Sequence, residues 1–273
     1  MKPGPEPSQR IEPRPWFALN RPIRDWQGKR VWIVGASTGI GAALARQLHA
    51  AGAMLALSAR NREKLVQLSA GWSNALCLPL DVTDPPALEQ AGKRIIDAWD
   101  GIDLVVLNAG SYSAVRAWEL ESQAARQTVE TNLLGVINGV IAVLPAMLAR
   151  GSGAIAIVGS VAGYHGLPNA IVYGATKSAL INLSETLYLD LQPKGIDVFL
   201  ISPGFVETPL TAQNRFRMPA LISADEAARR IVGGFAKGNF EIHFPKRFTL
   251  WLKLLELLPY RLYFALVRSF TGL

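Results

Sequence analysis

The chain has 273 residues, half of them hydrophobic, a length that suits one domain with a full core. Its single cysteine excludes an intrachain disulfide, and its three histidines lack cysteine or carboxylate neighbours at ligand spacing, so we expect no metal site. The net charge of +7 lies at the two ends: residues 1–30 and 243–273 each carry +4, and the stretch between them carries −1. This distribution argues against nucleic-acid binding, which needs a basic stripe across the fold.

The first part of the chain is rich in proline. Prolines between residues 3 and 15 interrupt any apolar run, so we predict no signal peptide and an irregular arm over residues 1–26.

From Arg30 onward, short apolar runs alternate with longer amphipathic ones. The runs predicted as strands are Arg30–Val34, Met54–Ala59, Ala75–Leu80, Leu104–Asn108, Ala154–Val158, Asp197–Ile201 and Glu241–Phe244. The stretches predicted as helices are Ile40–Ala51, Arg62–Ala70, Pro86–Ala98, Gln123–Leu148, Val172–Leu191 and Ala224–Ala236. Ser223 and Glu226 have the spacing of a capping box at the start of the last helix.

Strands that are apolar throughout are covered on both faces, and their alternation with helices indicates right-handed crossovers. We therefore expect an α/β fold with a doubly wound parallel sheet of about seven strands, helices on both of its faces and a short helical tail.

The first predicted strand runs directly into a turn that contains Gly35, Gly39 and Gly41, and a helix follows. Such a turn lets the backbone approach a pyrophosphate, which lies on the helix N-terminus where amide groups and the helix dipole favour negative charge. Glycines occur in many strand-to-helix turns, so the signal depends on its place inside a strand–helix–strand unit. The sequence therefore predicts a dinucleotide site on a Rossmann-like sheet.

The second predicted strand ends at Ala59, and Arg60 follows it. In dinucleotide-binding folds, an acidic residue about 20 positions after the loop binds the ribose 2′-OH of NAD, whereas a nearby arginine accommodates the 2′-phosphate of NADP. The arginine, without the acidic residue, favours NADP(H) over NAD(H). An ordinary exposed arginine at a strand end is the alternative.

Tyr173 and Lys177 lie four positions apart on a predicted helix, so both side chains share one face. A phenol has a pKa of about 10 and is a poor base at neutral pH, but an adjacent ammonium group stabilises its phenolate. Ser160 ends a predicted strand upstream, where its hydroxyl can bind the same substrate oxygen. The three residues predict proton exchange between Tyr173 and a substrate oxygen. The alternative is an amphipathic helix with a tyrosine in the core and a lysine in solvent. The glycine turn and Ser160 argue against this alternative, because it explains neither of them.

Three further segments lie in or next to predicted elements. They are Asn108–Gly110 after the fourth strand, Asn132 inside a long helix, and Pro203–Thr208 after the sixth strand. With the glycine turn and the Tyr173–Lys177 pair, they make the chain resemble the short-chain dehydrogenase/reductase family from about Gln27 to Phe244. The chain departs from the family at Val34, where Thr is common, and at Leu107, where a second Asn is typical.

The resemblance implies an NADP(H)-dependent oxidoreductase that reduces a carbonyl, or oxidises the alcohol, by hydride transfer. The implied catalytic residues are Asn132, Ser160, Tyr173 and Lys177. Ser160 would polarise the carbonyl oxygen and Tyr173 would protonate it. Lys177 would tune the phenol and bind the nicotinamide ribose, and Asn132 would hold a water in the proton path.

The residues implied for the cofactor are Gly35, Ser37, Thr38, Gly39, Ile40, Gly41, Arg60, Asp81, Val82, Asn108, Ala109, Gly110, Tyr173, Lys177, Pro203, Gly204, Val206 and Thr208. A dinucleotide-binding catalytic domain would then span residues 27–245, with a tail over residues 246–273. Family members commonly pair through two long helices, which implies a homo-oligomer, a dimer or a tetramer. A non-catalytic NADP(H)-binding regulatory or interaction protein is the second function, and the complete set of four catalytic residues argues against it.

The segment after Pro203 sets substrate specificity in the family, and here residues 209–219 are predicted to form a mobile lid. Its apolar residues Leu210, Phe216 and Met218 favour an apolar, lipid-like carbonyl or alcohol as the substrate.

The tail over residues 248–273 has no apolar run near the ~20 residues that span a bilayer, and Pro259 divides it into two predicted short helices. Both are too apolar to lie alone in water. Two interpretations are open: a helix pair lying in an anionic membrane surface, or packing on the substrate entrance or on a partner subunit. The basic residues favour the membrane, so we expect a cytoplasmic protein that is peripheral on the inner face of the cytoplasmic membrane.

Overall fold

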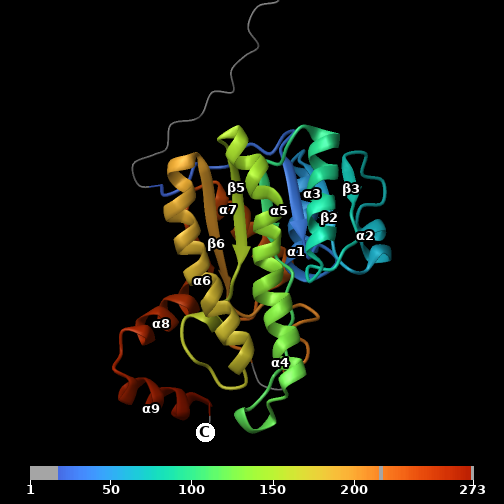
Figure 1. Ribbon diagram of the computed structural model, residues 1–273. Coiled ribbons are helices and arrows are strands. Elements are labelled where there is room, and N and C mark those ends of the chain that lie inside the picture. The colour runs from blue at the N-terminus through green and yellow to red at the C-terminus, as the bar shows by residue number, and fades with distance from the viewer. Residues whose placement is uncertain (1–17, 215–217, 272–273) are drawn as a thin grey trace, which may run out of the picture.

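The computed structural model describes residues 18–214 and 218–271, which form a parallel sheet between two layers of helices (Figure 1). The sheet has seven strands in the order β3-β2-β1-β4-β5-β6-β7. Its strands are β1 (Arg30–Val34), β2 (Met54–Ser58), β3 (Ala75–Cys77), β4 (Leu104–Leu107), β5 (Gly153–Val158), β6 (Ile196–Pro203) and β7 (Glu241–Phe244). The predicted Rossmann-like fold is confirmed.

The helices divide into two layers. Those of the main fold are α1 (Gly39–Ala50), α2 (Arg62–Leu68), α3 (Pro85–Trp99), α4 (Ser122–Val129), α5 (Gly135–Arg150), α6 (Ile171–Leu191) and α7 (Ala224–Phe235). One core lies between the sheet and α1, α2 and α7, and the other between the sheet and α3, α5 and α6. Alternate residues of β1 serve the two cores, with Val31 and Ile33 in the first and Trp32 in the second.

Most predicted elements match the structure to within two residues at each end, and two differ by more. The helix predicted over Gln123–Leu148 consists of α4, a π-helical segment at Glu130–Leu134 and α5, because one turn there is wider than an α-helical turn. The strand predicted over Ala75–Leu80 ends at Cys77, although the Leu78 and Leu80 N–H groups still donate to the Leu57 and Ala59 carbonyls at 2.9 and 3.2 Å.

The predicted capping box at Ser223 is half formed. The Ser223 hydroxyl accepts from the Glu226 backbone N–H at 3.2 Å. The Glu226 carboxylate pairs instead with Arg229 and Arg230.

Residues 18–26, predicted as part of an irregular arm, have no helix or strand but pack firmly on the domain. The buried Asn20 side chain donates to the Val198 carbonyl at 2.7 Å and accepts from the Val198 N–H at 3.1 Å. Arg21 pairs with Asp197 at 2.6 Å, and Trp26 is buried against Phe235. The arm is therefore attached from Ala18 onward, and residues 1–17 lie outside the described part of the chain.

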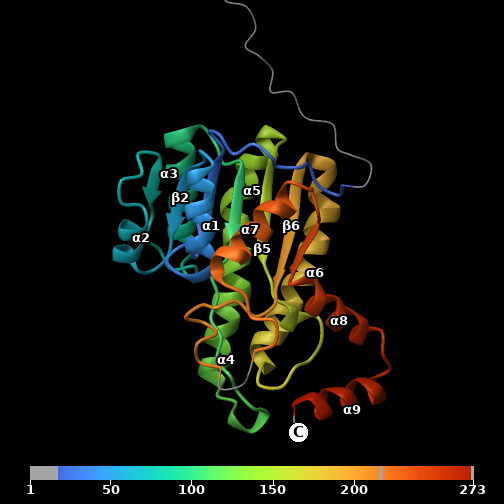
Figure 2. The ribbon, with the colours of Figure 1, turned by 180° about the vertical axis from the view of Figure 1, so that it is seen from behind.

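The last two helices, α8 (Lys246–Glu256) and α9 (Tyr260–Thr271), are separated near Pro259 as predicted. Both lie beyond α6, at the end of the molecule towards which the strands point (Figures 1 and 2). Among the described residues, the run Ser122–Arg150 alone is long and apolar enough to cross a bilayer, and its inner side packs on the sheet as a core helix does.

Candidate active site

A cleft of about 690 Å³ opens at the carboxyl ends of β1, β4, β5 and β6. All of the predicted cofactor and catalytic residues line it except Gly41 and Asn132. Ligands of doubly wound folds bind at this edge of the sheet, so the cleft stands where the fold alone would place a site.

The glycine turn packs closely against the backbone around it. Gly35 has a φ of 93°, and a Cβ there would lie 2.6 Å from the Ala109 backbone nitrogen. A Cβ at Gly41 would collide with the Gly35 carbonyl oxygen, which also accepts from the Asn108 amide at 2.8 Å. Gly41 therefore contributes close packing beneath the turn. The first turn of α1 carries no acidic residue, and its N-terminus is thus suited to a pyrophosphate.

Arg60 lies at the edge of the cleft, exposed to solvent. Among the described residues, no hydrogen bond or ion pair engages its guanidinium group. Asn61 caps α2 next to it, and Asp81, which also lines the cleft, accepts from the Thr83 hydroxyl at 2.9 Å. The side chain of Ala59 adds no carboxylate. These residues fit the adenosine half of a dinucleotide, with a cation free to meet a phosphate.

Tyr173, Lys177 and Ser160 meet deeper in the cleft. Ser160 follows β5 and accepts from the Ala162 N–H at 3.1 Å, which fixes its hydroxyl. The buried Lys177 ammonium donates to the Val158 carbonyl at 2.8 Å and lies 5.6 Å from the centre of the Tyr173 ring.

The electrostatics of this group differ from the prediction. Burial raises the pKa of Tyr173 to about 12, although the Ser160 hydroxyl acts in the opposite direction. Burial also lowers the pKa of Lys177 to about 8. The expected lowering of the phenol pKa is wrong for this arrangement because burial dominates and the ammonium is directed at the Val158 carbonyl. At neutral pH Tyr173 is therefore protonated and able to donate.

Asn132 lies beneath the cleft surface, in the π-helical segment, with no solvent exposure. Its amide accepts from the Ser111 N–H at 2.7 Å and donates to the Ser111 carbonyl at 2.8 Å. A Cβ at Gly110 would lie 3.5 Å from the Asn132 oxygen and 3.8 Å from the Lys177 nitrogen. Asn132 thus fixes the loop after β4, and Gly110 of that loop lies near both Asn132 and the Lys177 ammonium.

The sequence interpretation missed a group of cleft residues on that loop. Ser111, Tyr112 and Ser113 line the cleft, and the Tyr112 ring packs edge-on against Tyr173 with centroids 4.9 Å apart. Gln213, from the segment after β6, donates to the Tyr112 carbonyl at 2.7 Å. The position of Ser111, Tyr112 and Ser113 directly after Asn108–Gly110 could have indicated that they line the cleft.

The predicted lid is only partly described. Leu210 lines the cleft and Met218 does not, and Phe216 lies outside the described residues.

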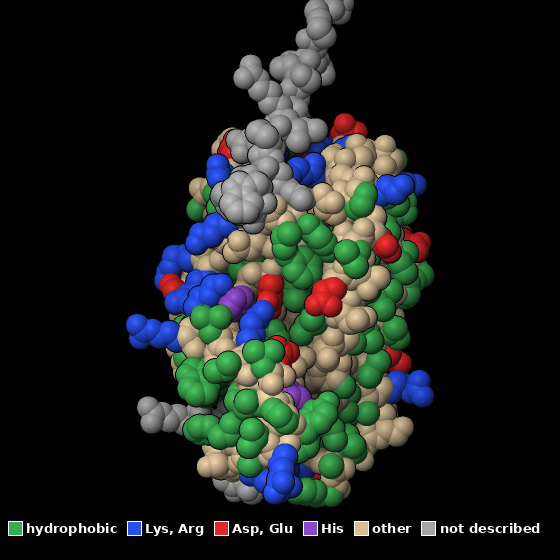
Figure 3. All heavy atoms as spheres, turned by 90° about the vertical axis from the view of Figure 1, so that its left-hand side faces the viewer, with side chains coloured by type: hydrophobic (Ala, Val, Ile, Leu, Met, Phe, Trp, Pro, Cys, Tyr) green, Lys and Arg blue, Asp and Glu red, His purple; other side chains and the backbone are tan. Residues whose placement is uncertain are grey.

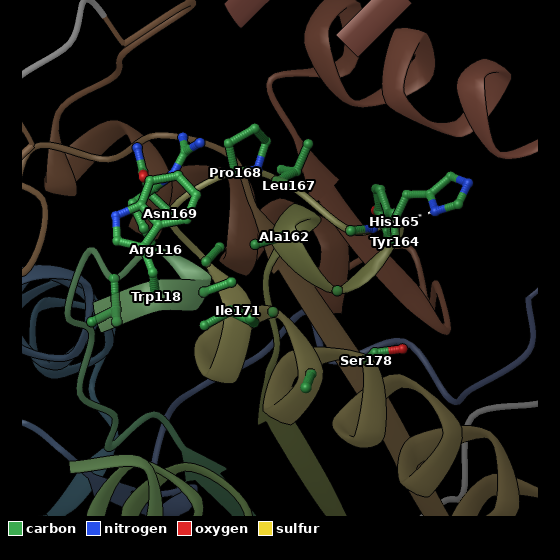
Figure 4. A pocket seen from close by; sticks show the side chains of 17 residues that line it. Arg116, Trp118, Ala162, Tyr164, His165, Leu167, Pro168, Asn169, Ile171 and Ser178 are labelled. Carbon is green, nitrogen blue, oxygen red and sulfur yellow. Dashed lines mark hydrogen bonds between the residues drawn. The ribbon is translucent and has the colours of Figure 1, made fainter. Parts of the chain in front are cut away.

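A second cavity, of about 540 Å³, lies between the loops that follow β4 and β5 and the start of α6 (Figure 4). Trp118, Leu167, Pro168 and Ile171 surround it in Figure 4. Trp118 is 76% exposed at the rim, with the Arg116 guanidinium 4.7 Å from its ring centre. The cavity is mainly apolar, and Ala162 and Gly174 in its lining are neighbours in the sequence of Ser160 and Tyr173 in the cleft.

Comparison with known proteins identifies the family of the chain. The family model described as short chain dehydrogenase matches residues 29–218. An uncharacterised oxidoreductase of Myxococcus xanthus is 33% identical over 240 residues, which cover 86% of this chain and 95% of the relative. Another, from Staphylococcus epidermidis, is 31% identical over 201 residues, 73% of this chain and 87% of the relative.

Two solved structures share the fold. A short-chain dehydrogenase from Streptomyces avermitilis has a TM-score of 0.73 at 27% identity and covers 83% of this chain and 92% of its own. A short chain dehydrogenase/reductase from Burkholderia phymatum, solved in complex with NAD, has a TM-score of 0.78 at 23% identity and covers 85% and 94%. The chain belongs to the short-chain dehydrogenase family, and it is an oxidoreductase of that type.

Proposed function

We propose that this protein is an NADP(H)-dependent reductase of an apolar, lipid-like carbonyl compound, with Tyr173 as the proton donor. The observation that supports this most is geometric: Tyr173, Ser160 and Lys177 lie in the same cleft as the glycine turn.

In this proposal the bound nicotinamide supplies the hydride. The Ser160 hydroxyl, held by the Ala162 N–H, binds the carbonyl oxygen and orients it. Tyr173 gives its proton to the same oxygen, and the nearby charge of Lys177 stabilises the phenolate that remains. Asn132 fixes the loop after β4 through Ser111, and this loop carries Gly110 beside Lys177, where Asn132 would support proton exchange between Lys177 and solvent.

The choice of NADP(H) over NAD(H) depends on Arg60, the exposed cation at the adenosine end of the cleft. A 2′-phosphate carries charge that a guanidinium group binds in bidentate fashion. With alanine at position 59, a 2′-phosphate meets no carboxylate there.

The preference for apolar substrates is supported by Tyr112 and Leu210 in the cleft and by the apolar cavity beside it. A panel of long-chain, aromatic and steroidal ketones, assayed at 340 nm with NADPH and with NADH, tests the reaction, the cofactor and the substrate class together. Turnover with small polar ketones only would contradict the substrate class, and turnover with NADH only would contradict the cofactor.

The alternative of a non-catalytic NADP(H)-binding regulator is not favoured for a member of this family of oxidoreductases. NADPH binding without turnover of any carbonyl or alcohol would revive it.

We also propose a homo-oligomer formed through α5 and α6. Leu134, Ile141 and Leu148 on this side are between 43% and 52% exposed, and Leu189 of α6 is 71% exposed. A second copy would cover this apolar surface. Light scattering that finds only a monomer at micromolar concentration would contradict the proposal.

A further inference from the structure

The two C-terminal helices leave most of their large apolar side chains in contact with solvent. Their exposed fractions run from 36% to 80%. We call the following set the tail surface: Leu250, Trp251, Leu254, Leu257, Tyr260, Leu262, Phe264, Leu266 and Phe270. A soluble monomer rarely exposes so many large apolar side chains on one short segment, so we expect this surface to be covered by a partner.

The tail surface is held in a defined orientation. On α8, Lys253 forms an ion pair with Glu241 of β7, and the Tyr164 hydroxyl donates to the same carboxylate at 2.5 Å. Thr249 of α8 is fully buried and bonds His243 of β7 at 2.6 Å.

On α9, the only buried side chain is Tyr263. Its ring stacks on His165 with centroids 3.7 Å apart, and its hydroxyl donates to the Gly166 carbonyl at 2.6 Å. These contacts fix both helices on the domain, yet Tyr260, Leu266 and Phe270, which share the Tyr263 face of α9, remain exposed beside the contact. Arg261 and Arg268 lie on the opposite side of α9.

Positive charge accompanies the apolar residues. Residues 246–271 include Lys246, Arg247, Arg261 and Arg268, all exposed, and Glu256 is the one acidic residue among them. The fifth cation, Lys253, is turned inward to Glu241. Figure 3, which faces this side of the molecule, shows hydrophobic side chains gathered over its lower part with Lys and Arg side chains at the margins.

We propose that the tail surface docks on an anionic lipid bilayer, with α8 and α9 lying in the plane of the head groups. Leucine and aromatic side chains enter the acyl boundary while basic residues meet lipid phosphates, the composition of an interfacial helix. A second copy of this chain fits less well, because a symmetric contact would place the same four cations opposite one another. Docking itself does not depend on the proposed reaction.

The tail surface lies next to a loop that lines the apolar cavity. The residues that α9 contacts, His165 and Gly166, follow Ser160 after one 3-10 turn and line the apolar cavity. Trp118, on the loop after β4, lies at the same rim. If the proposed function holds, docking turns the substrate side of the enzyme towards the membrane, where a lipid-like carbonyl would be found.

Flotation with vesicles tests the proposal on the full-length protein. Vesicles of phosphatidylcholine alone are compared with vesicles that contain phosphatidylglycerol, at low and at high salt. We expect binding to the anionic vesicles only, weakened by salt because screening shortens the reach of surface charges. The double variant Leu257→Glu with Phe270→Glu should bind at least about tenfold more weakly, since both apolar side chains lose their insertion. The double variant Arg261→Glu with Arg268→Glu should also bind more weakly and lose most of its salt dependence.

The matched control is Val66→Glu on α2, where the side chain is 51% exposed and distant from the tail. It should bind like the unchanged protein. NADPH affinity and melting temperature, measured on every variant, distinguish loss of docking from loss of folding. Three results would overturn the proposal: no flotation of the full-length protein, equal binding to both vesicle types, or tail variants that dissociate an oligomer without changing vesicle binding. None of these results bears on turnover, so failure of docking and failure of the proposed reaction remain separable.

Discussion

The side chains of the active-site cleft find partners within the chain, whereas those of the C-terminal tail largely do not. In the cleft, polar side chains at depth find partners within the chain: Asn132 bonds Ser111, Lys177 bonds Val158 and Ser160 bonds Ala162. In the tail, α9 buries one side chain and exposes its other large apolar residues except the half-buried Val267. The cleft is thus complete as a folded structure, whereas the tail surface has the composition of an interface whose second half lies outside the chain.

The largest effect on turnover is expected when the charge of Lys177 is removed. Lys177→Met should lower turnover by about a hundredfold to ten-thousandfold, because the phenolate left by Tyr173 loses its counter-charge. In the unchanged protein the pKa of Lys177 is lowered to about 8, so its charge is present below that pH and lost above it. Reductive kcat/KM should therefore fall as the pH rises through about 8. A profile that stays flat to pH 10, or a variant with ordinary turnover, would contradict this role.

Close packing beneath the glycine turn gives the second prediction. Gly41→Ala should weaken NADPH binding by about tenfold to a hundredfold, since its Cβ would collide with the Gly35 carbonyl and displace the turn. Gly233→Ala on α7 is the control, because a Cβ there meets nothing within 4 Å. It should leave binding unchanged and raise stability slightly, as helix propensity predicts. Isothermal titration with NADPH distinguishes the two outcomes.

Arg60 tests the cofactor choice. Arg60→Ala should weaken NADPH binding by about tenfold to a hundredfold and leave NADH binding nearly unchanged. The reason is that Arg60 would form a charge-assisted hydrogen bond with the 2′-phosphate, which NADPH carries and NADH lacks. Arg62→Ala on α2, an exposed arginine outside the cleft, should affect neither cofactor. Equal losses for both cofactors at position 60 would show that this side chain does not meet a 2′-phosphate.

The smallest effect is expected at the base of the tail. Burial raises the pKa of the Glu241 carboxyl, but Lys253 and Tyr164 outweigh it and hold the pKa below its usual value of 4.5. The ionised carboxylate therefore stabilises the fold above about pH 4.5, and this contribution is lost as the pH falls through the lowered pKa.

Glu241→Gln should cost about 1–2 kcal/mol of the free energy of unfolding at pH 7 and increase protease cleavage in α8, with NADPH affinity unchanged. Asp225→Asn, in an ion pair whose partners are 51% and 62% exposed, should cost almost nothing in a urea titration. If NADPH affinity falls with Glu241→Gln, the tail and the cleft are not independent.

The sequence predicted the sheet and the glycine turn well because both follow from local patterns: apolar runs covered on two faces, and glycines between a strand and a helix. The π-helical segment around Asn132 was not predictable, since its residues continue the helical pattern on both sides. The packing of Asn20 was also missed, because its partner Val198 lies far along the chain and irregular segments carry no periodicity.

The sign of the Tyr173 pKa shift was wrong because spacing on a helix says nothing of burial or of which carbonyl the Lys177 ammonium contacts. The tail was predicted as two helices from Pro259, but the contact of Tyr263 with the loop after Ser160 required the structure.

The central claim, that Tyr173 is the proton donor in a reductase, is tested most directly by the Tyr173→Phe variant with a ketone accepted in the 340 nm assay. The variant keeps the ring that packs against Tyr112 and removes only the hydroxyl. We predict that hydride transfer in a single turnover falls by at least about a hundredfold while NADPH affinity and melting temperature stay close to those of the unchanged protein. Substantial turnover by the variant would contradict the account.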